Sequence, residues 1–337
     1  TDIVRLTEWR KKKLKRLSKL LPGKIQPLAP NEALNLLEEI VALAQREPHR
    51  PTDWRGRPGG IVSLPERLTP VLVGDLHASV DNMLVVLTQN GFLEALEEGR
   101  CCLVILGDAI YSGVHLHPED LHRSLRMMDF LFRLKLRFPD RVFYLRGHHD
   151  SFSGEQGSGD LQLGALWESE LRRTRGKKYL RTMERYYALM PYLALSRDFV
   201  ACHAGAPAFK VTRDMLINIR QYPDLENALT RNRAHKANRR TGYNKNDVKR
   251  FRKRLALEEN IPFITAHNPL SGNDTPWSQV DDIPQHWQVY SGGVHWVGLA
   301  TRVGGRMVPL KYPGEPLLAL FNSQYARPAF PLRTPSR

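Results

Sequence analysis

The chain of 337 residues is poor in cysteine and has no long apolar run. Of its three cysteines, Cys101 and Cys102 are neighbours in an apolar stretch, and no Cys-x-x-Cys pair occurs, which argues against a disulfide framework and against structural zinc. No run approaches the ~18 apolar residues of a membrane span, and the first residues lack the pattern of a signal peptide. We therefore expect a protein of the reducing cytoplasm with no transmembrane segment.

Acidic residues are scarce relative to basic ones. Lysine and arginine number 50 and aspartate and glutamate 35, a net charge of +15. This excess favours anionic partners without choosing among phosphoproteins, nucleotides, nucleic acid and acidic membranes. Two basic segments, 10–16 and 231–254, carry much of it and are candidates for contact with an anionic partner. Residues 1–22 read as a basic amphipathic helix, and we favour one that packs a face on the protein body over one that binds membranes or partners.

Apolar periodicity divides the rest of the chain into alternating elements. A helix is expected after Asn31, its predicted N-cap, and a linker rich in Pro, Gly and Arg follows over 47–68. Beyond residue 69 the pattern predicts strands over 71–73, 101–106, 142–145, 192–202 and 261–265, helices over 81–96, 121–137 and 161–190, and antiparallel strands over 287–312. Such alternation is typical of an α/β fold in which helices wrap a parallel sheet.

Aspartate and histidine follow five of the predicted strands, in the loops where ligands bind in such sheets. They are Asp75, Asp108, the pair His148 and His149, His203 and His267, each near a small residue that lets the backbone turn sharply. They could be separate turn and cap residues, but we prefer a shared metal site, because a buried cluster of such groups needs metal or partners. Mixed Asp and His ligation suits Mn, Fe or Zn, and two divalent ions about 3.5–4 Å apart can activate water for attack on a phosphoryl group.

Five short motifs carry a family resemblance: Gly-Asp-Leu-His (74–77), Gly-Asp (107–108), Leu-Arg-Gly-His-His-Asp (145–150), Cys-His-Ala-Gly (202–205) and Ala-His-Asn (266–268). In this order they resemble the calcineurin-like metallophosphoesterases, and more narrowly the PPP-type serine/threonine protein phosphatases, over about residues 71–295. The resemblance implies a sandwich of central β-sheets flanked by helices. We expect an N-terminal helical extension and linker over 1–68, a metallophosphoesterase domain over 69–325 and a C-terminal tail over 326–337.

The resemblance also implies a role for each matching residue. Two divalent ions would be held, the first by Asp75 and His77, the second by His148, His203 and His267, with Asp108 bridging them. His149 would protonate the leaving oxygen, as a catalytic acid. Arg240 matches an arginine that grips phosphate in the family, and His295 falls near the family's active-site tyrosine loop.

Ala78 and Ala204, where glycine is usual in the family, are mild departures from its pattern, and three other departures bear on the chemistry. Tyr111 and Ser112 stand where the family has an aspartate that orients the acid histidine and an arginine that grips phosphate, and His148 replaces an asparagine. A serine cannot supply the bidentate bonds of a guanidinium, and an imidazole ligand shifts the metal preference toward Zn or Fe. Activity on phosphoproteins would then be weak, or another group would compensate; His115 and His117 are the candidates, with surface-loop histidines as the alternative.

Three functions are compatible with these features. The first is hydrolysis of phosphate monoesters on a phosphorylated substrate, of the protein-phosphatase type, by a two-metal-activated water. The second is a phosphodiesterase or nucleotide hydrolase, whose substrate the basic segment 231–254 would contact. The third is a binding protein on a phosphatase scaffold that has lost turnover through Tyr111 and Ser112. Metal-dependent turnover of an aryl monoester, compared with a diester, distinguishes them.

Overall fold

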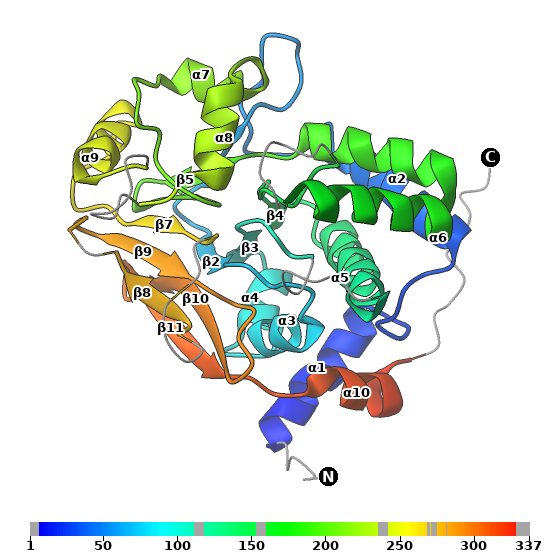
Figure 1. Ribbon diagram of the computed structural model, residues 1–337. Helices are drawn as coiled ribbons and strands as arrows, with labels where there is room; N and C mark the ends of the chain where they lie inside the picture. Colours follow the sequence, from blue (N-terminus) through cyan, green and yellow to red (C-terminus); the bar gives the residue numbers. More distant parts are fainter. Residues whose placement is uncertain are drawn as a thin grey trace.

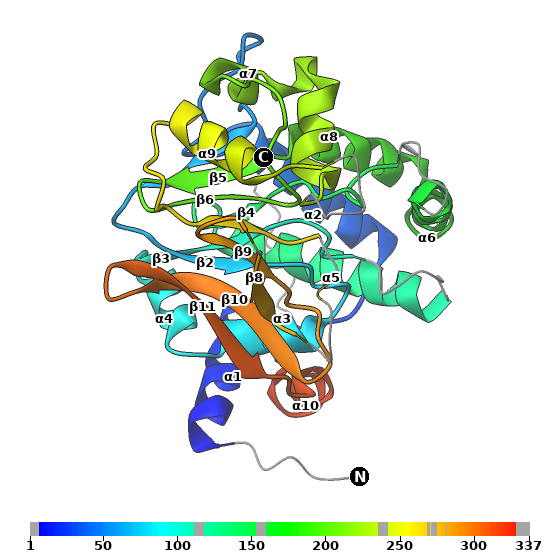
Figure 2. The same cartoon turned by 60° about the vertical axis from the view of Figure 1, so that its left-hand side comes forward.

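Two β-sheets lie face to face at the centre of the molecule, and helices cover their outer faces (Figures 1 and 2). The computed structural model describes residues 7–110, 118–152, 160–234, 242–267, 270, 275–280 and 282–327. Within these residues, the strands are β1 (Ile61–Ser63), β2 (Thr69–Val73), β3 (Cys101–Ile105), β4 (Val142–Tyr144), β5 (Leu193–Ser196), β6 (Phe199–Cys202), β7 (Phe263–Thr265), β8 (Trp277–Gln279), β9 (His286–Val289), β10 (Trp296–Val303) and β11 (Arg306–Pro313).

One sheet has the strand order β1-β5-β6-β7-β9-β8 and the other β11-β10-β2-β3-β4. Strands β2, β3 and β4 run parallel in the five-stranded sheet, and β6, β7 and β9 run parallel in the six-stranded sheet. This arrangement places the carboxyl ends of three strands of each sheet where loops can build a common site. The predicted α/β fold, with central sheets flanked by helices and helices at the N-terminal end, is confirmed.

The strands are apolar on both faces because both faces are buried. Alternate residues point to opposite sides of a strand. Leu72 and Val104 join Ile264 of the other sheet in the core between the sheets. Their neighbours Val71 and Leu103 face the helical layer instead. This explains why the strands read as continuous apolar runs rather than as alternating patterns.

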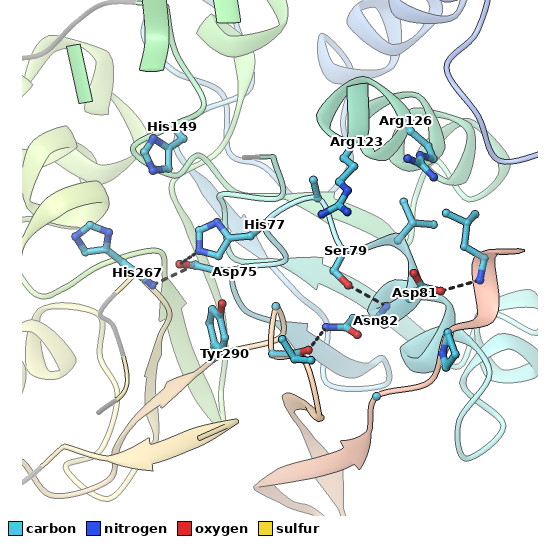
Figure 3. Close-up of a pocket in the computed structure, with 18 of the residues that line it drawn as sticks. Asp75, His77, Ser79, Asp81, Asn82, Arg123, Arg126, His149, His267 and Tyr290 are labelled. Atoms are coloured by element: carbon cyan, nitrogen blue, oxygen red, sulfur yellow. Dashed lines mark hydrogen bonds and ion pairs between the residues drawn. The ribbon is translucent and has the colours of Figure 1, made fainter. Parts of the chain in front are cut away.

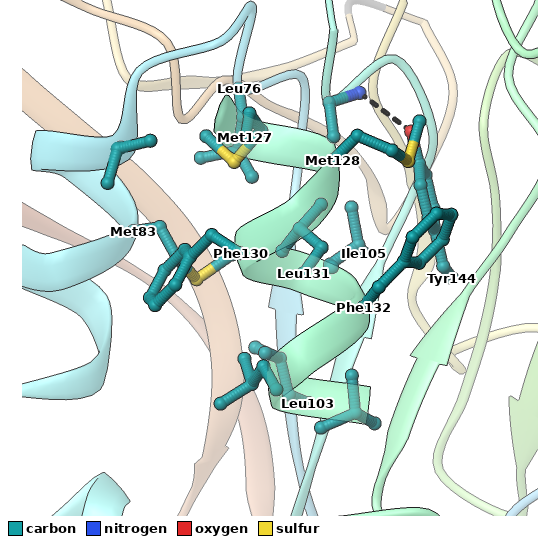
Figure 4. Packing of buried hydrophobic residues seen from close by; sticks show 14 of the residues in the cluster. Leu76, Met83, Leu103, Ile105, Met127, Met128, Phe130, Leu131, Phe132 and Tyr144 are labelled. Atoms are coloured by element: carbon teal, nitrogen blue, oxygen red, sulfur yellow. Dashed lines mark hydrogen bonds between the residues drawn. The ribbon is translucent and has the colours of Figure 1, made fainter. Parts of the chain in front are cut away.

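The helices are α1 (Glu8–Leu20), α2 (Pro30–Ala44), α3 (Val80–Leu87), α4 (Phe92–Glu97), α5 (Pro118–Arg137), α6 (Asp160–Leu189), α7 (Arg213–Ile217), α8 (Pro223–Arg231), α9 (Lys245–Arg254) and α10 (Leu317–Leu320). Helix α5 packs on the five-stranded sheet, with Phe130 and Leu131 buried in the cluster that contains Leu103 and Ile105 of β3 (Figure 4). This packing fixes the face of α5 that borders the site described below.

The basic N-terminal helix packs on the body, as predicted. Leu14 and Leu17 of α1 are fully buried. Its basic face is partly neutralised within the chain, since Lys13 pairs with Glu94 and Arg16 with Glu97. Trp9 of the same helix is exposed. None of the helices in the described ranges combines the length and apolar composition needed to cross a bilayer.

Three sequence expectations differ from the structure. Helix α2 begins at Pro30 with Ala29 as its N-cap, so the assignment of Asn31 as the cap is wrong. The predicted helix over 81–96 is two helices, broken by Gly91 in a left-handed conformation (φ 73°). The predicted linker 47–68 contains strand β1, which pairs with β5. This short segment lies within a stretch rich in Pro, Gly and Arg, which reads as a loop, and its pairing with the distant strand β5 defines it.

Candidate metal centre

The candidate ligands lie at the carboxyl ends of parallel strands from both sheets. Asp75 follows β2, Asp108 follows β3 and His148 follows β4. His203 follows β6 and His267 follows β7, in the facing sheet. The packing of the two sheets therefore brings together residues that are up to 192 positions apart, as in the hydrogen bond from the His267 backbone N–H to the Asp75 carboxylate (3.2 Å; Figure 3).

The backbone at three of these residues is in the left-handed region. His77, Asp108 and His267 have φ values of 45°, 48° and 62°. Such a conformation is uncommon for residues with a side chain, and it concentrates at functional sites. Gly107, just before Asp108, has φ 109°, and a Cβ there would lie 2.7 Å from His203 Nδ1. The loop thus packs closely enough that only glycine fits.

Asp108, His148, His203 and His267 form a compact cluster, each offering a ligand atom within 4.8 Å of the others. His148 Nδ1 lies 2.6 Å from Asp108 Oδ2, 3.1 Å from His203 Nε2 and 3.2 Å from His267 Nδ1. Ligand nitrogens of a tetrahedral zinc ion, at about 2.05 Å from the metal, are about 3.4 Å apart. The two imidazole–imidazole separations are close to that value and the Asp108–His148 contact is shorter, so the four side chains are near enough to surround one cation.

Buried polar atoms without a partner support the same interpretation. Among the described residues, Asp108 Oδ2, His267 Nε2 and His77 Nδ1 are buried and lack a hydrogen bond of good geometry. Buried polar atoms are normally satisfied, and exceptions in a cluster of this composition point to an ion. A carboxylate with imidazole nitrogens is the donor set of Zn, Fe and Mn sites, so the residues present fit a transition metal.

The electrostatics of the cluster require a positive charge. Burial disfavours ionisation of Asp108, but the imidazoles of His148 and His203 outweigh it and hold the pKa of that carboxyl well below its usual range. Burial also opposes protonation of His203, yet Asp108 raises its pKa to about 9. Burial and the like charges of His203 and His148 lower the pKa of His267 well below its ordinary value, which favours the neutral ring that can ligate. A bound cation can supply the positive charge that protons supply in this cluster.

Asp75 and His77 stand beside this cluster. Asp75 Oδ2 lies 3.6 Å from His77 Nε2, and Asp75 Oδ1 lies 3.7 Å from His203 Nδ1. Burial raises the pKa of Asp75, and the charge of His203 only partly opposes this shift. A carboxylate and an imidazole side by side could hold a second ion next to Asp108.

Asp150 supports the loops that carry the ligands, a role that sequence reasoning did not assign. Its Oδ2 accepts hydrogen bonds from the backbone N–H groups of Gly147 (2.8 Å) and Asp108 (3.1 Å), and Oδ1 accepts from the Tyr144 hydroxyl (2.7 Å). Burial and the charge of Asp108 raise the pKa of Asp150 to about 6. The sequence feature that could have identified Asp150 is its position at the end of the Gly-His-His-Asp motif.

The cluster opens into a cleft of about 930 Å³. Asp75, His77, His148, His149 and His267 line it together with Tyr290 and Arg233 (Figure 3). Tyr290 was missed by sequence reasoning, although it directly follows β9 and so has the same position relative to a strand as the ligands. The ring of His77 lies 5.9 Å from that of Tyr290, centroid to centroid.

Other residues predicted at the site are not placed in it. His295 is exposed and is absent from the residues that line the cleft, whereas Tyr290 of the preceding segment faces it. Arg240 lies outside the described residues, and so do Tyr111, Ser112, His115 and His117. Their predicted roles stay predictions.

Comparisons with known proteins identify a family for the chain. The sequence profile of the calcineurin-like phosphoesterases matches residues 68–298. Serine/threonine-protein phosphatase rdgC of Drosophila melanogaster is 28% identical over 147 residues, which are 43% of this chain and 20% of that protein. The chain therefore spans about a fifth of the length of this relative.

Solved structures share the fold at low sequence identity. A protein serine/threonine phosphatase from Saccharomyces cerevisiae with similarity to human phosphatase PP5 matches with a TM-score of 0.64 and 15% identity, over 86% of this chain and 91% of that one. A cold-active protein-tyrosine phosphatase of a psychrophile Shewanella species matches with a TM-score of 0.50 and 13% identity, over 76% and 82% of the two chains. The profile match covers most of the chain, and Asp and His residues within the matched range meet at the cleft: this protein belongs to the calcineurin-like phosphoesterase family.

Proposed function

We propose that the protein hydrolyses phosphate monoesters on phosphorylated proteins, as a serine/threonine phosphatase with a two-metal centre. The observation that carries the proposal is the convergence of Asp108, His148, His203 and His267 within 4.8 Å at the base of the cleft. Two similar proteins, from Drosophila and yeast, are named as serine/threonine phosphatases, which supports the choice of substrate.

In this proposal Asp75, His77 and Asp108 hold one divalent ion, and Asp108, His148, His203 and His267 hold the other. Mn, Fe and Zn are the candidates for both positions. Ions so placed would lower the pKa of an attacking water and offset the charge of the phosphoryl oxygens. Asp108 is suited to the bridging position because its fully buried carboxylate, whose pKa is held low, stays ionised.

His149 is the proposed acid that protonates the leaving oxygen. Its ring lies against that of His148 at a centroid distance of 3.8 Å, and its backbone N–H donates to Asp108 Oδ1 (3.0 Å). These contacts support a fixed ring at the mouth of the metal centre, where proton transfer needs it.

Arg233 lines the same cleft, and its charge contributes to the lowered pKa of His267. We propose that Arg233 contacts the phosphate from that side. The buried thiols favour a cytoplasmic setting for this activity.

The proposal is tested by hydrolysis of para-nitrophenyl phosphate by metal-stripped protein, with Mn, Zn and Fe added back in turn. We expect turnover that depends on metal and that falls at least 100-fold in Asp108→Asn, because the amide cannot supply the bridging charge. Metal-dependent turnover that persists in Asp108→Asn would contradict the site assignment. No turnover with any ion, in folded protein that binds metal, would contradict the monoesterase proposal.

Substrate class is tested separately. We expect kcat/KM on phosphoserine and phosphothreonine peptides to exceed that on a matched phosphotyrosine peptide and on bis-para-nitrophenyl phosphate. A preference for phosphotyrosine would assign the protein to the activity named for the Shewanella neighbour. A preference for the diester would favour the phosphodiesterase alternative.

A further inference from the structure

The cleft extends beyond the metal centre to a second group of polar residues on helix α5. Arg123 and Arg126 line it there, facing Ser79 and Asp81 at the start of α3. Figure 3 shows both guanidinium groups across the cleft from His149 and His267, with His77 between them and the metal centre. The two arginines are three residues apart and therefore lie on the same side of their helix.

The charge of these arginines is not balanced by the surrounding protein. Within the described part of the chain, Arg126 has no hydrogen bond or ion pair, and its Nε is buried without a partner. Burial, then the like charge of Arg123, lowers the pKa of Arg126, and Asp81 only partly opposes this. Arg123 is mostly exposed and has one contact with Asp120 at the limit of an ion pair, 4.0 Å. Two neighbouring guanidinium groups whose positive charge is not balanced by the protein favour an anion between them.

The carboxylates that line this part of the cleft are engaged elsewhere. Asp81 Oδ1 accepts a hydrogen bond from the backbone N–H of Leu318 (2.7 Å). Glu315 forms an ion pair with Arg10 of helix α1 (2.5 Å). These contacts leave the arginine donors available to a ligand, since neither acid bonds to them in the described residues.

The size of the cleft indicates that the ligand is larger than the reacting phosphate. A volume of about 930 Å³ is at the upper end of the roughly 300–1,000 Å³ of sites that hold a whole drug-sized molecule. A single phosphate at the metal centre fills a small part of it. Arg123 and Arg126 lie in the remaining part, where the chain that carries the phosphate would run.

We infer that Arg123 and Arg126 form a second anion-binding subsite, which takes an acidic or phosphorylated side chain of the substrate peptide while the reacting phosphate lies at the metal centre. This inference rests on the proposed phosphoprotein phosphatase function and adds a sequence preference to it. Guanidinium groups bind carboxylate and phosphate oxygens through the same paired donors, so both side-chain classes fit. The subsite selects phosphorylation sites that have a negative charge within a few residues.

The test uses phosphoserine peptides in which one glutamate is placed in turn at each of the six positions before and the six positions after the phosphoserine. Matched peptides carry glutamine at the same position. A second series carries phosphoserine in place of that glutamate and distinguishes phosphate from carboxylate. Binding of labelled peptides to the Mn-loaded His149→Gln protein, which keeps every proposed metal ligand, is followed by fluorescence anisotropy, and kcat/KM is measured with the active protein. The binding measurement needs no turnover, so it reports on the subsite even where hydrolysis fails.

We expect a glutamate at the favoured position to tighten binding and raise kcat/KM about tenfold over glutamine, a typical effect of one or two charge-assisted hydrogen bonds. Arg126→Gln and, independently, the exposed Arg123→Gln should reduce this ratio to about one. Arg173→Gln, an exposed arginine of α6 paired with Glu170, is the matched control and should keep the ratio. Equal binding of acidic and neutral peptides at every position would overturn the inference, and so would a ratio that survives in the Arg123→Gln/Arg126→Gln double variant. Loss of turnover with the binding preference intact would count against the proposed function alone.

Discussion

Replacement of Asp150 by alanine tests whether one buried carboxylate holds the ligand loops in place. The side chain is fully buried and accepts three hydrogen bonds, from the backbone N–H groups of Gly147 and Asp108 and from the Tyr144 hydroxyl. Asp150→Ala leaves all three donors without an acceptor. A buried donor without a partner costs about 1–3 kcal/mol, so the loss of three acceptor contacts should lower the free energy of unfolding by roughly 3–9 kcal/mol.

Tyr144→Phe is the matched partial change, because it removes only the hydroxyl. That hydroxyl donates to Asp150 and accepts from the Ala109 backbone N–H (3.1 Å). We expect it to cost about 1–2 kcal/mol and to leave both backbone bonds of Asp150 intact. Urea unfolding of metal-free protein, followed by tryptophan fluorescence, measures both changes. Calorimetric titration with Mn should also show weaker binding for Asp150→Ala, since Asp108 and the His148 loop lose their anchor. A loss of stability below about 1 kcal/mol for Asp150→Ala would refute the reasoning.

Three further changes test other contacts. Gly107→Ala should lower Mn affinity at least tenfold, because the added Cβ would meet Gly147 Cα and His203 Nδ1, each at 2.7 Å. The affinity is measured by titration calorimetry. Gly305→Ala is the control, since Gly305 also has a positive φ but a Cβ there would meet no atom within 4 Å. Lys135→Met should lower the free energy of unfolding by about 3–5 kcal/mol in urea, because it breaks a buried ion pair with Glu47 (2.5 Å) and leaves two carbonyls without their donor. His286→Gln should make the protein less sensitive to acid.

The sign of the His286 effect follows from its burial. Burial lowers the pKa of His286 to about 3, below its ordinary value of about 6.5. The unfolded chain therefore takes up a proton below pH 6.5 that the folded protein does not, and stability contributed by the neutral ring falls as the pH falls. At pH 5 this loss is about 2 kcal/mol relative to pH 7. Urea unfolding at both pH values should show it in the wild type and not in the variant; equal losses in the two proteins would contradict the assignment. For Lys135→Met, unchanged stability would show that the pair with Glu47 contributes nothing net.

Much of the fold could be predicted from the sequence because the elements that build it have strong local signals. The strand over Cys101–Ile105 is a short apolar run bounded by turn residues, and helix α5 has an amphipathic period over its length. The ligand residues were predicted for the same reason: each follows such a run beside a small residue. Where the local signal is weak or mixed, prediction failed, as at β1 and at the break between α3 and α4.

The sequence by itself determined the elements, their order, and the set of Asp and His residues at the ends of strands, because periodicity and turn chemistry act over a few residues. Only the tertiary structure decided which of these side chains meet, since Asp108 and His267 belong to different sheets and no local interaction places one beside the other. It also decided that Tyr290, rather than His295, faces the cleft, and that α5 turns Arg123 and Arg126 toward it. The physical reason is that burial and charge neutralisation depend on neighbours distant along the chain, and packing of the two sheets supplies those neighbours.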